Sequence, residues 1–422
     1  PYRTGFACTG GNKTNVRKKT ESTSLFRRLV FFTLKNQKGE TDMKDYSVFA
    51  EENRQEYVDV LQALTERPSP SYKENRIAKW IRELLCGYAE KSGYDQVHIY
   101  EDDICNVYCE LGEAFEPGSE CFAVTAHTDT VFPDMEGPLP FERDGSGRIY
   151  GLGIKDNRAN ICALLFCAKY IFEEGIVPEK RLLFVFNVCE EGTGNLAGSK
   201  RVLEHYPEIC RWIAFDLDYT TIFCKALGSV RYKITITGQG GHSYNDFGRK
   251  NAIVAMSELI RLFYQINPEE YSGAVTYNVG RIQGGTTVNA IAEECQADFE
   301  IRSDDSESLE KLQEYFDTLL EKTRQEGAGE LEVKKDILGI RPSMGGFSEE
   351  GMVQQIGLVE RISRIIREIT GKAPDVKSGS TDCNVPLSRG IPSICIGTCL
   401  GAGEHTRQEY IEEASLKNGL II

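Results

Sequence analysis

Residues 122–132 constrain the fold most, because they combine a buried strand with two reactive side chains. They read Phe-Ala-Val-Thr-Ala-His-Thr-Asp-Thr-Val-Phe, and such a short run of small and β-branched residues is typical of a mostly parallel sheet. His127 and Asp129 follow where this strand ends, and open α/β sheets bind ligands at the carboxyl ends of their strands. Because the two residues are two positions apart on an extended chain, Asp129 can orient the His127 ring. The pair becomes a candidate metal site only if further strand-end ligands accompany it.

The length and charge of the chain exclude some classes of protein. A chain of 422 residues is too long for one core and indicates about two or three domains. The formal net charge of −15 argues against nucleic acid as a main partner, because phosphate binding requires a basic face.

Residues 1–42 differ from the rest, with nine Lys/Arg against three Asp/Glu. Their apolar run, residues 29–32, is too short for a signal peptide or a membrane span, and we expect no membrane contact. We predict a disordered or mis-called extension before Met43, and a basic interaction arm is the alternative.

The fourteen cysteines indicate reduced thiols rather than a disulfide framework. They are scattered, no Cys-x-x-Cys pair occurs, and several stand in apolar runs, as small buried hydrophobic residues do. We therefore expect a cytoplasmic location.

Alternating helical and strand patterns predict an α/β catalytic domain formed by residues 43–228 and 340–422. Glycines in residues 150–157 precede one of the helices. The expected helices are 55–64, 75–85, 159–172, 357–370 and one from Ile411, and the expected strands are 96–100, 106–110, 122–127, 182–188, 212–215 and 391–396.

Residues 229–339 show a different order and predict an inserted α+β domain. The expected strands and helices follow the order β-α-β-β-α-β, which is the ferredoxin-like motif. Their ranges are 230–238, 251–264, 274–283, 295–302, 307–323 and 331–335.

Acidic residues and histidines gather at the predicted strand ends, and only five histidines occur in the chain. Two imidazoles with several carboxylates suit a pair of divalent ions, with zinc favoured and cobalt or manganese possible. In the adjacent pair Glu190 and Glu191, one carboxylate can bind metal while the other acts as a general base. The strand-end residues are His127, Asp156, Glu190, Glu191, Asp216 and His405.

Six short motifs follow one another along the chain: Ala-His-Thr-Asp-Thr-Val-Phe, Gly-Leu-Gly-Ile-Lys-Asp-Asn, Glu-Glu-Gly, Gly-Gly-His-Ser, Gly-Gly-Thr-Thr-Val-Asn-Ala-Ile and Gly-Glu-His. In these motifs and in their order, the chain resembles the co-catalytic zinc exopeptidases and deacylases. This family includes carboxypeptidase G, peptidase T, aminoacylase, and the acetylornithine and succinyl-diaminopimelate deacylases. The resemblance extends from about residue 55 to residue 408.

The resemblance implies a role for each strand-end residue. Asp156 bridges both metals, and its bond to Asn157 is expected to be cis. His127 and Asp216 complete one metal site, for which Asp218 is a rival to Asp216, while Glu191 and His405 complete the other. Glu190 is the general base, and Asp129 orients His127.

Residues outside the metal site are implied to contact the substrate. His242 resembles the histidine of the inserted domain that stabilises the oxyanion, and in dimeric relatives it comes from the other subunit. A homodimer formed through a lid domain is therefore implied. Asn289 resembles a substrate-holding residue, and Arg341 resembles an arginine that binds a substrate carboxylate, for which Arg302 is an alternative.

These features predict a two-metal hydrolase that removes one residue from short peptides, like peptidase T or carboxypeptidase G. An N-acyl-amino-acid deacylase is the close alternative, because its amide chemistry is identical. A catalytically inactive metal-binding scaffold is an alternative of another class, although no residue of the expected site is missing.

Overall fold

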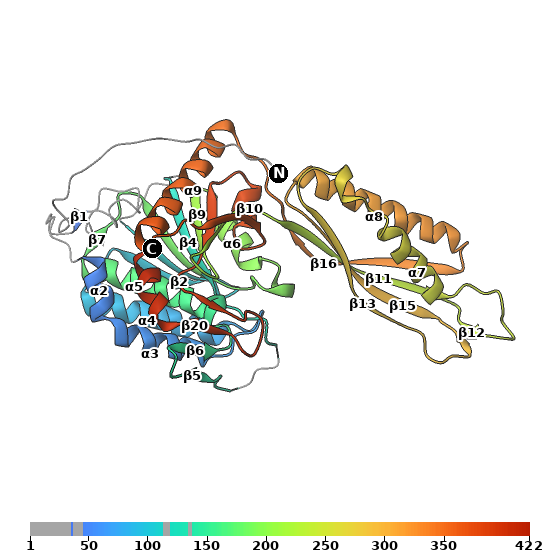
Figure 1. The fold of residues 1–422 in the computed structure, drawn as a ribbon, viewed down its shortest axis with the longest axis horizontal. Helices are drawn as coiled ribbons and strands as arrows, with labels where there is room; N and C mark the ends of the chain where they lie inside the picture. Colours follow the sequence, from blue (N-terminus) through green and yellow to red (C-terminus); the bar gives the residue numbers. More distant parts are fainter. Residues whose placement is uncertain (1–34, 37–44, 113–118, 134–136) are drawn as a thin grey trace.

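The computed structural model describes residues 35–36, 45–112, 119–133 and 137–422. The expected extension, residues 1–42, lies outside the described residues except for the two-residue strand β1 (Lys35–Asn36). Figure 1 shows a larger body built on an eight-stranded sheet and a smaller, elongated body built on a four-stranded sheet. None of the helices in the described ranges is both long enough and apolar enough to cross a membrane.

The eight-stranded sheet places the predicted central strand, β4 (Cys121–His127), between two parallel neighbours. These are β8 (Arg181–Asn187) and β9 (Ile209–Phe215), and β18 (Ser393–Ile396) pairs parallel with β9. The prediction of a mostly parallel sheet is confirmed for this central part, and antiparallel pairs occur toward both edges. The outer strands are β2 (Val97–Glu101), β3 (Val107–Leu111), β10 (Thr221–Ala226) and β17 (Asp375–Gly379).

Helices cover both faces of this sheet because its strands are apolar on both sides. In β8, Leu182, Phe184 and Phe186 pack into the core that includes α5 (Ala159–Glu173), while Leu183 and Val185 pack into a second core with residues of α6 (Ala197–His205). Successive side chains of a strand point to opposite faces, so a single strand serves both cores. The other helices of this body are α2 (Tyr46–Glu52), α3 (Arg54–Thr65), α4 (Asn75–Ser92), α9 (Glu349–Thr370), α10 (Asn384–Ser388) and α11 (Leu416–Ile421).

The four-stranded sheet has the predicted β-α-β-β-α-β order. Its spatial order is β13-β15-β11-β16, all pairs are antiparallel, and this is the ferredoxin-like arrangement. Aromatic side chains from the sheet and both helices form its core, including Tyr232, Phe263, Phe299 and Phe316. The elements are β11 (Gly228–Gly238), α7 (Ala252–Phe263), β13 (Val275–Gly284), β15 (Glu294–Ser303), α8 (Ser306–Glu326) and β16 (Leu331–Arg341).

A small sheet joins two segments that are far apart in the sequence. Its spatial order is β19-β20-β6-β5, and Tyr150 in β6 pairs with Tyr410 in β20. It brings the segment just before Asp156 beside the segment just after His405. The strands are β5 (Phe141–Arg143), β6 (Arg148–Gly151), β19 (Gly401–Ala402) and β20 (Tyr410–Glu412).

Three expected helix boundaries are wrong. The helix expected to end at residue 85 is α4, which continues to Ser92, with Gly93 in a left-handed conformation after it. The helix predicted from Ile411 begins only at Leu416, because Ile411 is a fully buried strand residue that pairs with Ile149. Helix α9 begins at Glu349 rather than at residue 357, because the Ser348 hydroxyl accepts the backbone N–H of Gly351 and caps the helix there.

Candidate dinuclear metal site

Three neighbouring parallel strands carry predicted site residues at their carboxyl ends. His127 ends β4, Glu190 and Glu191 follow β8, and Asp216 follows β9. The backbone N–H of Thr128 donates to the carbonyl of Asn187 at 2.7 Å, which ties the end of β4 to the end of β8. Because the strands run the same way, the side chains meet at one edge of the sheet, as the strand-end argument predicts.

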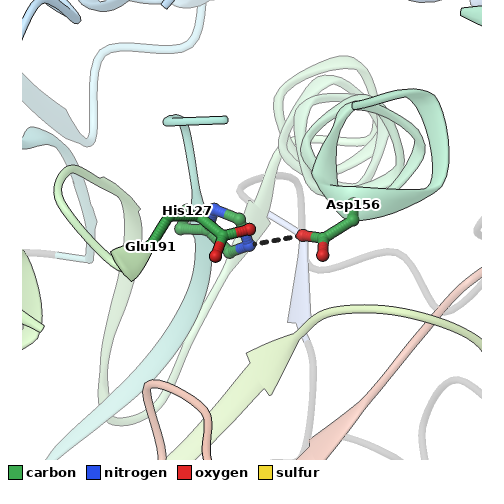
Figure 2. A group of neighbouring side chains, drawn as sticks. All are labelled: His127, Asp156 and Glu191. Atoms are coloured by element: carbon green, nitrogen blue, oxygen red, sulfur yellow. Dashed lines mark ion pairs between the residues drawn. The ribbon is translucent and has the colours of Figure 1, made fainter. Parts of the chain in front are cut away.

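The predicted ligands form a single cluster in which Asp156 faces two histidines. His127 Nε2 lies 2.9 Å from Asp156 Oδ1 and 3.6 Å from Asp216 Oδ1. His405 Nε2 lies 3.1 Å from Asp156 Oδ2 and 3.1 Å from Glu191 Oε1. Figure 2 shows His127, Asp156 and Glu191 pointing toward one another. We call His127, Asp156, Glu191, Asp216 and His405 the ligand cluster.

The ligand cluster fits divalent cations in its chemistry. His127 Nε2, Asp156 Oδ1 and Asp216 Oδ1 are buried and converge without forming hydrogen bonds. Burial, and then the neighbouring Asp156, raise the pKa of Asp216 to about 7, since the carboxylates repel one another. Bound cations relieve this repulsion, and a carboxylate with one oxygen toward each of two ligand sets suits a bridging position. Imidazole and carboxylate donors fit zinc, cobalt or manganese.

Asp129 supports both the His127 ring and the Glu190–Glu191 turn. Its Oδ1 lies 3.4 Å from His127 Nδ1, and its two oxygens accept the backbone N–H groups of Glu190 and Glu191, each at 2.9 Å. The Ser71 hydroxyl donates to Asp129 Oδ2 at 2.6 Å. A carboxylate held by three donors is a rigid support for the imidazole.

Glu190, the predicted general base, is buried and pairs with Arg341. Arg341 Nη1 donates to Glu190 Oε1 at 2.9 Å, and Arg341 Nη2 donates to the Glu190 carbonyl. Burial raises the pKa of Glu190 well above its usual value, and the charge of Arg341 acts in the opposite direction. The sequence did not predict this contact. The alternative arginine, Arg302, instead pairs with Glu300 at 2.9 Å in its own strand.

His242 and Asn289 lie in the inserted part and do not join the ligand cluster. His242 belongs to the short strand β12 (Gly241–His242), which pairs with β14 (Ala290–Ile291) beside Asn289. Both side chains are exposed, and Figure 1 shows β12 at the far end of the smaller body, away from β4. His242 Nδ1 accepts the backbone N–H of Tyr244 at 3.2 Å. This bond places the ring proton on Nε2 and makes that atom a hydrogen-bond donor.

Glu409 is a buried carboxylate that the sequence analysis missed. It accepts three backbone N–H groups from the turn that holds Asp156: Gly153 at 2.8 Å, Lys155 at 2.8 Å and Asp156 at 2.9 Å. The peptide bond from Asp156 to Asn157 is cis, as expected. The sequence signal was a glutamate four residues after His405, but its partners are more than 250 residues away. Glu409 therefore fixes the Asp156 turn from outside the ligand cluster.

Replacing Glu409 with glutamine is expected to weaken metal affinity or activity by about 10–100-fold, the range typical of groups that orient metal ligands. The glutamine amide places an NH₂ group against a backbone donor, so at least one of the three hydrogen bonds is lost. Metal titration and kcat/KM measure the effect. Glu412→Gln is the matched control, since Glu412 is exposed and three residues away. A Glu409→Gln variant with the same metal affinity and kcat/KM as this control would contradict the supporting role of Glu409.

The comparison with known families agrees with the arrangement of these side chains. The model of peptidase family M20/M25/M40 matches residues 123–422, which is more than half of the chain. The chain belongs to this family. The membership confirms the resemblance drawn from the motifs and makes the chain a hydrolase of peptide or acyl amide bonds.

Individual relatives are distant in sequence. An acetylornithine deacetylase of Vibrio campbellii is 26% identical over 320 residues, which are 71% of this chain and 79% of that protein. A probable carboxypeptidase of Aspergillus oryzae is 24% identical over 262 residues, which are 57% of this chain and 62% of that protein. The chain thus spans less than two thirds of the length of this carboxypeptidase.

Solved structures share the fold. Aminopeptidase PepT of Bacillus cereus aligns with a TM-score of 0.67 at 22% identity, covering 87% of this chain and 96% of that one. A tripeptidase of Staphylococcus aureus aligns with a TM-score of 0.69 at 21% identity, covering 87% and 97%. A dinuclear metal-binding peptidase of the same family from Bacillus subtilis aligns at 0.60 and 17% identity, covering 88% and 96%.

Proposed function

We propose that this protein is a dinuclear metallopeptidase that removes single residues from short peptides. The observation that carries the proposal is the position of Asp156, whose two oxygens face His127 and His405, with the buried Glu190 next to the ligand Glu191. His127 and Asp216 would hold one ion, Glu191 and His405 would hold the other, and Asp156 would serve both. Zinc is the proposed metal, and cobalt or manganese suits the same donors.

The ions would supply polarisation of the scissile carbonyl and a more acidic water for attack. Glu190 accepts the proton of the attacking water and delivers it to the leaving amine. Its raised pKa suits a group that must hold a proton between these two transfers. Asp129 keeps His127 in place, because it faces the ring nitrogen opposite the one that binds metal.

Arg341 is the proposed site for a free carboxylate of the substrate. Its guanidinium is buried and lies beside Glu190, and a planar fork of donors binds carboxylates well. In the structure it holds Glu190, so a substrate carboxylate must share this arginine with the general base. Asn289 is proposed to help hold the substrate together with His242, next to which it lies.

A panel of di- and tripeptides and N-acetyl amino acids, with zinc or cobalt added, tests the substrate class. Faster turnover of the peptides supports the exopeptidase. Faster turnover of N-acetyl amino acids favours the deacylase, a candidate supported by the acetylornithine deacetylases among the relatives. Absence of turnover on every member, with both ions bound, would contradict both assignments.

His242 is proposed to act in the partner subunit of a homodimer, because its strand β12 lies at the far end of the smaller body, away from the strand β4 that ends at His127. Its exposed Nε2 donor would stabilise the oxyanion there. Large apolar side chains lie exposed near it, as an interface requires: Tyr244, Phe247 and Val288.

Replacing His242 with alanine is expected to lower kcat by about 10²–10³-fold, the usual effect of losing one oxyanion donor. Mixing this variant with Glu190→Gln should restore activity, because a hybrid dimer contains one site with both groups. Subunit exchange predicts up to about a quarter of wild-type activity for a symmetric dimer. His98→Gln is the control, since His98 is exposed on the edge strand β2. Failure of the mixture to gain activity, despite proven hybrid dimers, would contradict action across subunits.

A cytoplasmic location is part of the proposal. All thirteen cysteines in the described part of the chain are free thiols, and many are buried. Reduced cysteines of this kind are typical of proteins from reducing compartments.

A further inference from the structure

Lys155 is a buried lysine directly before Asp156, and its side chain contacts residues beside two other members of the ligand cluster. Its Nζ lies 3.0 Å from Asp218 Oδ2 and also contacts Glu404 Oε1. Asp218 is two residues after Asp216, and Glu404 immediately precedes His405. One ammonium group therefore joins the three loops that carry Asp156, Asp216 and His405.

We propose that Lys155 is a positioning residue that sets the mutual placement of the two metal sites. The inference rests on the proposed two-ion site, to which it adds a residue that touches neither ion. Lys155 acts through Glu404 on His405, and through Asp218 on the loop of Asp216. Its own backbone N–H donates to Glu409, so both ends of Lys155 are held.

His405 needs such support more than His127 does. The side chain of His127 is 1% exposed, whereas that of His405 is 54% exposed. His405 also has a φ of +62°, a left-handed conformation that a non-glycine residue adopts only when its surroundings hold it there. The adjacent Glu404, bound to Lys155, holds the backbone at this point.

The Asp216 loop is held by the other contact. Asp218 Oδ1 accepts the backbone N–H of Thr220 at 2.9 Å, which leaves Oδ2 to Lys155. The backbone carbonyl of Asp218 accepts the N–H of Gly397 at 3.0 Å. Asp218 was the alternative to Asp216 as a predicted metal ligand. In the structure it binds the ammonium group of Lys155 instead.

The sign of the effect separates positioning from simple electrostatics. A positive charge near two cations repels them, so charge alone predicts that removing the Lys155 ammonium tightens metal binding. A positioning role predicts weaker metal binding instead. Without the ammonium group, Asp218 and Glu404 repel each other, and the loops that carry the metal ligands separate. The direction of the change in metal affinity therefore decides between the two roles.

The test is a zinc titration of the metal-stripped full-length chain against a competing chelator. Lys155→Met is expected to weaken the binding of at least one ion by about 10–100-fold. Glu404→Gln should weaken the binding of the ion that His405 holds. The double variant Lys155→Met/Glu404→Gln should bind zinc little more weakly than Lys155→Met alone, because both changes remove the same contact between Lys155 and Glu404. Cobalt substitution gives a second readout, since a shifted visible spectrum reports altered ligand geometry.

Lys169→Met is the matched control. Lys169 is also a buried lysine, but it contacts Asn53 and Glu56 rather than residues beside the ligand cluster. This variant should bind both ions as the wild type does. If Lys169→Met also bound the ions more weakly, the loss of any buried lysine would be enough to weaken metal binding, and the specific role of Lys155 would be overturned.

Several results would overturn the inference without affecting the proposed function. One such result is a folded Lys155→Met variant that binds both ions as tightly as the wild type does, or more tightly. If Lys155→Met does not fold, two milder variants take its place. Glu404→Gln and Asp218→Asn each remove one contact of Lys155 at a partly exposed carboxylate. Unchanged zinc affinity in both variants would overturn the inference. A wild-type chain that binds fewer than two ions would instead overturn the proposed two-ion site, and with it this inference.

Discussion

Replacing Glu190 with glutamine is expected to lower kcat by about 10²–10⁴-fold, the usual range for loss of a general base. The variant should keep its metal. Glutamine has nearly the same shape and keeps an oxygen for Arg341 Nη1, which lies 2.9 Å from Glu190 Oε1. The backbone N–H of residue 190 still donates to Asp129. What is lost is the ability to accept a proton from the attacking water.

The measurement is kcat on the best peptide of the panel, with metal content determined on the same sample. Glu412→Gln controls for the loss of one carboxylate at an exposed position. A Glu190→Gln variant with metal bound and activity within a few-fold of the wild type would contradict the assignment of Glu190 as general base.

Replacing Asp156 with asparagine is expected to abolish activity by a different route, through loss of metal. Its Oδ1 faces His127 Nε2 at 2.9 Å, and its Oδ2 faces His405 Nε2 at 3.1 Å. An amide offers one oxygen and one NH₂ group, and the NH₂ group cannot bind a cation. One of the two ions then loses a ligand, and the loss of affinity should exceed the roughly 10–100-fold typical of supporting groups.

Zinc titration and metal analysis after dialysis measure this effect. Asp103→Asn is the control, because Asp103 is exposed and pairs with Arg201 outside the ligand cluster. The two variants should therefore differ in kind, since Glu190→Gln keeps its metal and Asp156→Asn does not. Full metal content in Asp156→Asn would contradict the bridging position of Asp156.

Much of the candidate site was predictable because it follows from local sequence and one topological rule. The strands β4, β8 and β9 are visible in the sequence as short apolar runs. Because these strands are parallel neighbours in the sheet, their carboxyl ends lie together. His127, Glu191 and Asp216 follow directly from this rule. The expected position of His405 at a strand end is wrong, because His405 lies in a loop between β19 and β20 rather than directly after a strand of the large sheet.

The parts that were missed depend on partners distant in the sequence. Strand β17 lies at the edge of the sheet and has mostly exposed residues, so its sequence shows no apolar period. Ile411 resembles a helical residue until its pairing with Ile149 is known. The contacts of Glu409 with the Asp156 turn and of Arg341 with Glu190 join polar residues that no local pattern connects.

Anomalous diffraction at the zinc edge, from crystals of the full-length chain grown with zinc, tests the central claim most directly. We expect two peaks about 3.5–4 Å apart, the usual spacing of a two-metal site, with Asp156 between them. One peak should lie beside His127 and Asp216, and the other beside Glu191 and His405. A single peak, or peaks away from Asp156, would contradict the two-ion site on which the proposed function depends.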